Sequence, residues 1–154
     1  MLLLACVAAL AACSFMTPPA ISALMGQVVK AVQSHNKSAL RACYAQEGVS
    51  KRQVDIQTGN WQQYLARDTP WTFTGITYVS LAEARHNKSI FPETIAMMTT
   101  GSTIGGYKFA PNIKVEGFIL VMFKVADGSE AGVTEPVGIA SDGTAKMAVV
   151  EPRH

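Results

Sequence analysis

The pattern of apolar and polar positions changes about halfway along the chain. From Ile21 to Val32 the apolar residues recur every three or four positions, which is the spacing of an amphipathic α-helix with one buried face. From Trp71 onward, runs rich in aromatic and β-branched residues alternate with turn signals, among them two Asp-Gly pairs. The pattern therefore predicts helices first and an antiparallel sheet second, which is an α+β fold.

The segment Ile113–Val125, IKVEGFILVMFKV, is the longest strand candidate. Its odd positions form one apolar face, which we expect to pack against the helices. Phe118, Leu120 and Met122 make the middle of the opposite face apolar as well. We therefore expect these three residues to form an interface with a protein partner or a second copy of the chain.

Shorter elements are predicted around these two. A second helix, roughly Lys37–Glu47, places Cys43 and Tyr44 on its inner face. The other expected elements are a turn capped by Ser50, a helix Trp61–Arg67 capped by Asn60, a strand Trp71–Leu81 with a bulge or a close contact at Gly75, a polar turn Ala82–Ser89, a weaker strand Thr94–Thr100, a loop Gly101–Gly106, and strands Val133–Ala140 and Thr144–Val150 that complete a meander.

The amino-terminal segment predicts export and lipid attachment. Leu2–Ala12 is an uncharged apolar run, too short to span a membrane but typical of a signal peptide. It ends in Leu10-Ala11-Ala12-Cys13, which resembles the bacterial lipobox, with Cys13 as the acylated residue that carries the palmitate. No Lys or Arg precedes the apolar run, so an ordinary cleaved signal or a buried N-terminal helix remains open.

The predicted organisation follows from this cleavage point. Residues 1–13 are the signal peptide with its lipobox, 14–20 a tether, 21–151 a single α+β domain and 152–154 a tail. Ser14 after the cysteine favours the outer membrane by resemblance to sorted bacterial lipoproteins, so the domain is expected in the periplasm. Cys43 would then be the one free thiol, and we interpret it as a core residue.

The composition indicates the number of domains and argues against one class of partner, but it does not identify the function. The chain has 154 residues, 49% of them hydrophobic, and its net charge is +2 with the basic residues scattered. These values fit one domain and argue against nucleic acid as a partner. The three histidines share no metal-like spacing, and no cofactor-binding or catalytic motif is present.

The order of elements resembles the nuclear transport factor 2-like superfamily, a cone-shaped α+β fold related to the cystatin-like fold. The segments VVKAVQSHNKSALRACYAQEGVS and GFILVMFKVADGS are similar to the opening helices and terminal strands of exported members. The resemblance covers roughly residues 20–150 and implies helices packed on a strongly bent sheet that ends in a meander.

The resemblance also suggests where a pocket would lie. Enzymatic members place an acid or a histidine and a tyrosine inside the cone, where burial tunes a carboxyl for proton transfer. No catalytic motif carries over by position. Pro136 predicts a strand edge or bulge at which Glu135 reaches water. The candidate pocket residues are Tyr44, Asp55, Tyr64, Tyr78 and Glu135.

These observations favour a non-enzymatic envelope lipoprotein that acts as a binding or assembly module. It would contact the membrane through the lipid on Cys13 and bind a protein partner, and it could be a subunit of a larger complex such as a secretion apparatus. The alternative is a small-molecule enzyme or carrier that uses the cone pocket, with Glu135 or Asp55 as the acid–base group.

Overall fold

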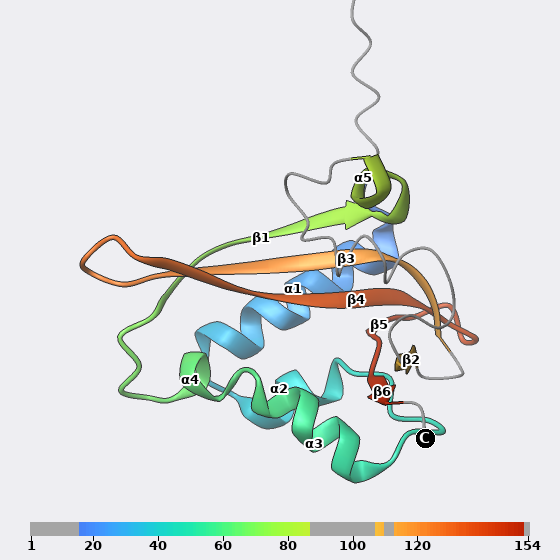
Figure 1. Cartoon of the computed structure of the whole chain (residues 1–154), viewed down its shortest axis with the longest axis horizontal. Coiled ribbons are helices and arrows are strands. Elements are labelled where there is room, and N and C mark those ends of the chain that lie inside the picture. Colours follow the sequence, from blue (N-terminus) through green and yellow to red (C-terminus); the bar gives the residue numbers. More distant parts are fainter. Residues whose placement is uncertain (1–15, 87–106, 110–112, 153–154) are drawn as a thin grey trace, which may run out of the picture.

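The computed structural model describes residues 16–86, 107–109 and 113–152 as an α+β domain (Figure 1). No helix within these ranges combines the length and the apolar character needed to cross a membrane. The elements in chain order are α1 (Pro19–Gln33), α2 (Lys37–Ala42), α3 (Lys51–Gly59), α4 (Gln62–Leu65), β1 (Thr72–Ser80), α5 (Leu81–His86), β2 (Tyr107–Phe109), β3 (Ile113–Lys124), β4 (Glu130–Ala140), β5 (Ala145–Met147) and β6 (Val150–Pro152).

The main sheet is antiparallel and open, with four described strands in the order β1-β3-β4-β5. The long apolar segment forms β3 in the interior of the sheet, as predicted. The pairing of β1 with β3 shifts register between Phe73 and Gly75, so of the two alternatives expected at Gly75 the structure shows the bulge and not the close contact. The third predicted strand, Thr144–Val150, is instead divided, because β5 ends at Met147 and β6 pairs with β2 in a separate two-stranded sheet.

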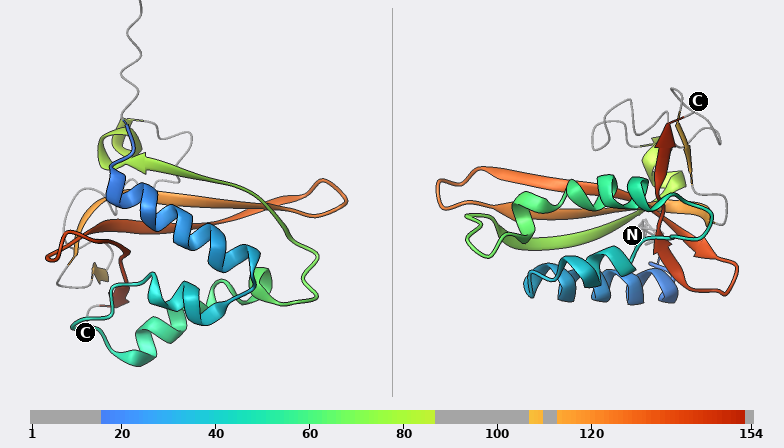
Figure 2. Two further views of the ribbon diagram at one scale, coloured as in Figure 1. Left: turned by 180° about the vertical axis from the view of Figure 1, so that it is seen from behind. Right: turned by 90° about the horizontal axis from the view of Figure 1, so that it is seen from below.

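Helices α1 to α4 lie on one side of the main sheet and extend past its edge, whereas α5 packs on Phe118 of the opposite face (Figure 2). Seen from behind in Figure 2, α1 runs obliquely across the strands, while α2 and α3 lie beside it. The stripe predicted from Ile21 to Val32 is the buried side of α1. Each large side chain buried there contributes about 1.5–3 kcal/mol relative to leaving it in water. The core joins these residues to Leu40, Trp61, Ile119, Val121, Phe123 and Val137.

Both predicted Asp-Gly turns are present. Gly128 and Gly143 have φ values of +91° and +83°, which glycine adopts without a steric penalty. Before them, the carboxylates of Asp127 and Asp142 accept backbone hydrogen bonds from Ser129 and Thr144. These bonds lower the pKa of each carboxyl below its usual value. The turns set the register of the β3–β4 and β4–β5 hairpins.

The second helix is shorter than expected. α2 ends at Ala42, whereas the sequence pattern predicts a helix to Glu47. Tyr44 forms an isolated parallel bridge with Met147, and the amide of Ala45 donates to the carbonyl of Met147 at 2.9 Å. Pairing with a distant strand therefore replaces the last turn that local propensity favours.

Three other boundaries differ from the prediction. Ser50 caps α3 as expected, but the helix runs on to Gly59. Asn60 ends α3 and does not cap the next helix, which is the short α4. The stretch expected to be a polar turn forms α5, because Ser80 and Glu83 cap each other reciprocally at its start. The strand predicted at 94–100 and the loop at 101–106 lie outside the described residues.

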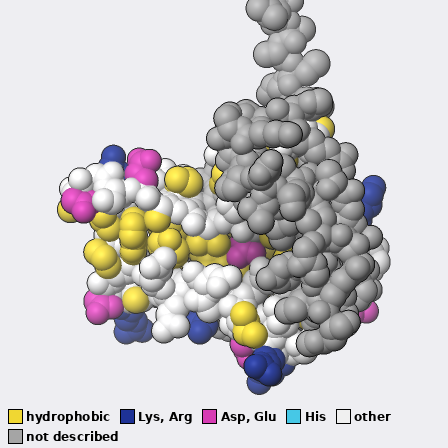
Figure 3. All heavy atoms as spheres, viewed as in Figure 1, with side chains coloured by type: hydrophobic (Ala, Val, Ile, Leu, Met, Phe, Trp, Pro, Cys, Tyr) yellow, Lys and Arg dark blue, Asp and Glu magenta, His cyan; other side chains and the backbone are white. Residues whose placement is uncertain are grey.

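The face of the molecule seen in Figure 3 is mixed in character. Hydrophobic side chains gather over the half of the sheet that leads to the β3–β4 hairpin, and charged groups surround them. Ala131 and Val133, on β4 in this half, are only half-buried although they pack against the core. Apolar surface thus continues from the core toward the hairpin end of the sheet.

Candidate functional site

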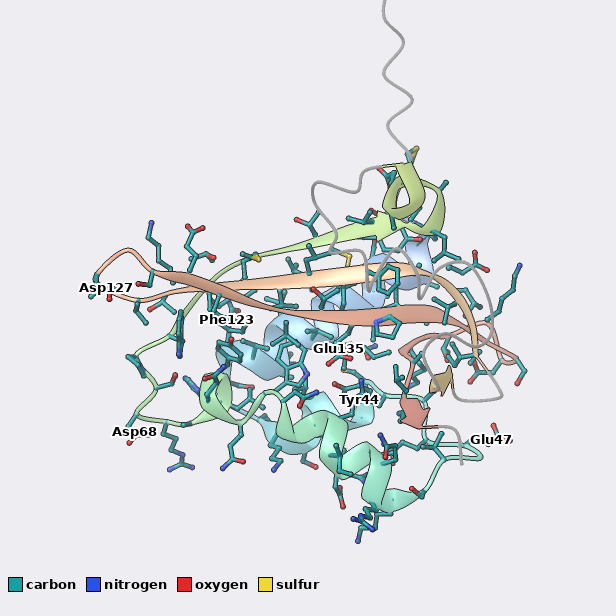
Figure 4. The ribbon with its side chains drawn as sticks, in the orientation of Figure 1. Tyr44, Glu47, Asp68, Phe123, Asp127 and Glu135 are labelled. Carbon is teal, nitrogen blue, oxygen red and sulfur yellow. The ribbon has the colours of Figure 1, made fainter. Side chains whose placement is uncertain are left out.

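The central polar site consists of one carboxyl group and three donors from the helical half of the chain. Glu135 lies on β4, Tyr44 follows α2, Gln57 is on α3 and Trp61 precedes α4. Figure 4 shows the side chains of Tyr44 and Glu135 between β4 and the helices, directed toward each other. We call these four residues the Glu135 cluster.

Each oxygen of the carboxyl group is bound by the protein. The hydroxyl of Tyr44 donates to Oε1 of Glu135 at 2.7 Å, and the indole Nε1 of Trp61 donates to the same oxygen at 3.0 Å. Trp61 Nε1 also lies 2.8 Å from the Tyr44 hydroxyl, which can accept from it. The amide Nε2 of Gln57 donates to Oε2 at 3.3 Å. No buried side-chain nitrogen or oxygen in the described part of the chain lacks a partner.

Burial decides the protonation of this group. Desolvation raises the pKa of Glu135, and the hydrogen bonds from its three donors lower it. Desolvation is the larger effect, so the pKa rises from 4.5 to about 7. The pKa of Tyr44 is raised far above its usual value, first by burial and then by the neighbouring Glu135. Tyr44 therefore remains a neutral donor, and the carboxyl changes its charge near neutral pH.

The expectation that Glu135 reaches water is wrong, because the residue is only 1% exposed. It pairs with Ile119 of β3, so its side chain shares the core face with Val137. The strand accommodates Pro136 at a place where no N–H is needed. The carbonyl of Pro136 faces the side where β5 has just ended and accepts from the amide of Ala148 at 2.7 Å. The missing N–H of the proline faces that same side, since both backbone groups of a residue point to one neighbour in an antiparallel sheet.

The five predicted pocket residues are not brought together. Tyr44 and Glu135 are in contact, which the sequence pattern did not require. Asp55 is exposed and pairs with Arg41 at 3.0 Å. Tyr78 is half-buried, and its hydroxyl donates to the carbonyl of Glu116 at 3.1 Å. The fifth residue, Tyr64, stacks on Phe123 at a different place in the core.

The predicted interface residues divide into two groups. Phe118 is 1% exposed and clusters with Ala84 of α5, so it is not available at the surface. Leu120 is half-buried in the same cluster, and Met122 is 36% exposed. Among the described residues, the hairpin end of this face is open, whereas α5, which the sequence pattern did not predict, packs over the other end.

Cys43 is buried, as expected of a core residue. Its backbone carbonyl accepts from the amide of Met147 at 2.8 Å, and burial raises the pKa of its thiol. Cys13, the predicted lipidation site, lies outside the described residues. The described part of the chain contains no group of three or more His, Cys, Asp or Glu side chains placed to hold a metal ion.

Sequence reasoning missed the role of Gln57. Its Oε1 accepts from the amide of Val150 at 3.1 Å while its Nε2 serves Glu135, so it connects β6 to the cluster. Gln53 lies one turn earlier and donates to the carbonyl of Val150 at 2.7 Å. The spacing of 53, 57 and 61, four residues apart each time, is the signal that could have placed these polar groups on one side.

Two of the clefts lined by described residues have the volume of a small-molecule site, and neither is lined by Glu135. The first has a volume of about 360 Å³ and lies where the end of α1, the loop after α4 and the first residues of β1 meet Phe123 of β3. The second, of about 310 Å³, is bordered by the segment after α2 and by the β4–β5 turn, and Lys146 lines it. Tyr44 lines the second cleft, whereas Glu135, which accepts the hydrogen bond of its hydroxyl, does not.

Comparisons of the chain with protein families, with curated proteins and with solved structures found no match. What the protein does must therefore be argued from its own residues.

Proposed function

We propose that this protein is a lipid-anchored binding or assembly module of a bacterial cell envelope. The support for an anchor is the apolar run that ends in Leu10-Ala11-Ala12-Cys13. α1 begins at Pro19, a few residues beyond that cysteine, so a lipid on Cys13 would hold the domain close to the membrane surface. Ser14 favours the outer membrane and the periplasmic side.

One observation supports a binding role in preference to a catalytic one: the carboxyl of Glu135 is buried and hydrogen-bonded to the protein itself. Its oxygens accept from three protein donors, and the side chain is 1% exposed. A general acid or base must lie within hydrogen-bond reach of its substrate. The geometry of the Glu135 cluster instead suits a group that joins the sheet to the helices.

Metabolic labelling with a radioactive fatty acid tests the anchor. We expect the wild-type protein and a Cys6→Ala variant to be labelled and a Cys13→Ala variant to be unlabelled. Cys43→Ala is a second control, because Cys43 is buried in the domain. An unlabelled wild-type protein would rule out the anchored form of the proposal.

The proposed protein contact uses the exposed end of the outer sheet face, at Met122 and the neighbouring Leu120. We expect the protein to co-purify with a partner, or with itself, from envelope solubilised in mild detergent. Met122→Asp should weaken that association, since it places a charge in the apolar contact. The same change at exposed Ile56, on α3, is the matched control. Sedimentation of the wild-type protein as a lone monomer from the envelope extract would contradict the assembly role.

We also propose membership of the nuclear transport factor 2-like superfamily, supported by the order of helices before an antiparallel meander. One observation favours the second candidate function, an enzyme or carrier: the pKa of Glu135 is raised to about 7, in the range of proton-transfer groups. Carbon-13 NMR titration of the Glu135 carboxyl, with and without small apolar ligands, tests it through a change of that pKa.

A further inference from the structure

The cleft between the end of α1, the loop after α4 and the start of β1 is open, unlike the Glu135 cluster. Arg67 lines it and gives it a positive charge. We propose that it binds a small anionic molecule with a flat aromatic body and a carboxylate group. We call it the Arg67 cleft. Its volume of about 360 Å³ falls in the range typical of small-molecule sites. The inference does not depend on lipid attachment at Cys13.

The apolar wall of the Arg67 cleft is a group of aromatic rings in contact with one another. Tyr64 stacks on Phe123 with ring centroids 4.1 Å apart and an interplanar angle of 13°. Trp71 meets Tyr64 edge-on at 5.7 Å, and Phe73 meets Phe123 edge-on at 6.3 Å. Trp71 and Phe73 are only half-buried, so parts of their rings are open to a ligand. A flat ring can extend this set of offset and edge-on contacts.

The charge at the rim selects an anion. Arg67 and His35 line the cleft, and no Asp or Glu does. The side chain of Arg67 has no ion pair or hydrogen bond within the described part of the chain, so its donors are available. A guanidinium group binds a carboxylate through two parallel hydrogen bonds. One free arginine beside an aromatic wall therefore suits a monocarboxylate better than a phosphate ester, which carries more charge.

The loop that carries Arg67 is held in place before any ligand arrives. The hydroxyl of Thr69 donates to the carbonyl of Gln63 at 2.6 Å and accepts from the amide of Trp71 at 3.2 Å. The amide of Thr69 donates to the carbonyl of Ala66 at 3.2 Å. These bonds fix the loop on both sides of Arg67, so little conformational entropy is lost on binding.

The test uses the full chain with 2-naphthoate and its uncharged analogue 2-naphthamide as probes. The chain has two tryptophans, and only Trp71 lines the cleft, while Trp61 is fully buried elsewhere. In proton–nitrogen NMR spectra we expect 2-naphthoate to shift the Trp71 indole signal saturably and to leave that of Trp61 unchanged. The naphthamide should bind about tenfold more weakly, because it lacks the charge.

Arg67→Gln should lower the affinity for 2-naphthoate about tenfold and remove the preference for acid over amide. Arg52→Gln, which changes an exposed arginine of α3 outside the cleft, is the matched control and should bind as the wild type does. If Arg67→Gln fails to fold, the acid-to-amide comparison on the wild type still tests the charge. Absence of a saturable Trp71 shift at millimolar probe, or equal affinity for acid and amide, would overturn the proposal.

Discussion

The hydroxyl of Tyr44 donates a 2.7 Å hydrogen bond to Oε1 of Glu135, although 91 positions separate the two residues in the chain. The bond joins the segment after α2 to the interior strand β4. It is one of three that bring donors from the helical half of the chain to a carboxyl group of the sheet. The interior of this domain is therefore held together by a specific polar contact as well as by apolar packing.

We predict that the free energy of unfolding falls as the pH rises from about 4.5 to 7, because Glu135 loses its proton at a lower pH in the unfolded chain than in the folded protein. Its pKa in the folded protein is raised from 4.5 to about 7, so the folded state holds the proton more tightly than the unfolded chain. The contribution is fully present below the unfolded pKa and is lost as the pH passes the folded one. A shift of this size corresponds to about 3 kcal/mol.

Urea unfolding at a series of pH values measures this effect. Glu135→Gln is the control, because the amide cannot ionise, and its free energy of unfolding should change less over the same interval. The lowered pKa values of Asp127 and Asp142 act in the opposite sense, but only as the pH falls below their ordinary value of 3.8. An unchanged pH slope in the Gln variant would show that another group is responsible.

Tyr44→Phe should destabilise the protein by about 1–3 kcal/mol, because it removes a donor from a buried carboxyl and an acceptor from Trp61. The loss should be larger at about pH 8 than at about pH 5, since the missing hydrogen bond raises the pKa of Glu135 further. Chemical unfolding at both pH values provides the measurement. Tyr78→Phe removes a half-buried hydroxyl that bonds to a carbonyl, and its smaller loss should not vary with pH in this interval.

Gln57→Ala should speed hydrogen exchange of the Val150 amide, because the Gln57 side chain is the acceptor for that N–H. Gln53→Ala is a matched control on the same helix, since Gln53 bonds to the carbonyl of Val150 and not to its amide. Native-state exchange followed by NMR distinguishes the two. Equal acceleration in both variants would indicate that β6 detaches as a unit and that Gln57 has no special role.

Gly117→Ala should cost about 1–3 kcal/mol, because a Cβ at this position would collide with the carbonyl of Val79 and the ring of Tyr78. Gly26 is an exposed glycine inside α1, and the space that a Cβ would occupy there is open. Gly26→Ala should therefore stabilise the protein by up to about 1 kcal/mol, as alanine favours helix more than glycine does. Thermal unfolding of the two variants should show shifts of opposite sign.

The elements with a strong periodic pattern could be predicted from the sequence. The stripe from Ile21 to Val32 became the buried face of α1, whereas Glu135, which was expected to reach water, lies on the core face of β4. Its burial could not be predicted in the same way, because its donors come from other elements that only the folded chain brings near. Local patterns cannot show such long-range partners.

A long-range contact also explains one helix boundary that differs from the prediction. The helix expected to reach Glu47 ends at Ala42 because the residues after it pair with Met147 near the other end of the chain. α5 is a different case, since the capping pair of Ser80 and Glu83 is readable in the sequence as Ser-x-x-Glu. That helix covers Phe118, so missing it led to an interface larger than the exposed surface allows.

Glu135 also bears on how β4 finds its correct alignment with β3. In the native register Glu135 lies opposite Ile119 on the core face. A slip by one residue would turn the carboxyl outward and bring Thr134 or Pro136 inward, away from Tyr44, Gln57 and Trp61. A slip by two residues would keep the alternating apolar residues on the core face, whereas it would still move this carboxyl away from its donors. The cluster therefore distinguishes the native pairing of the hairpin from its neighbours during folding.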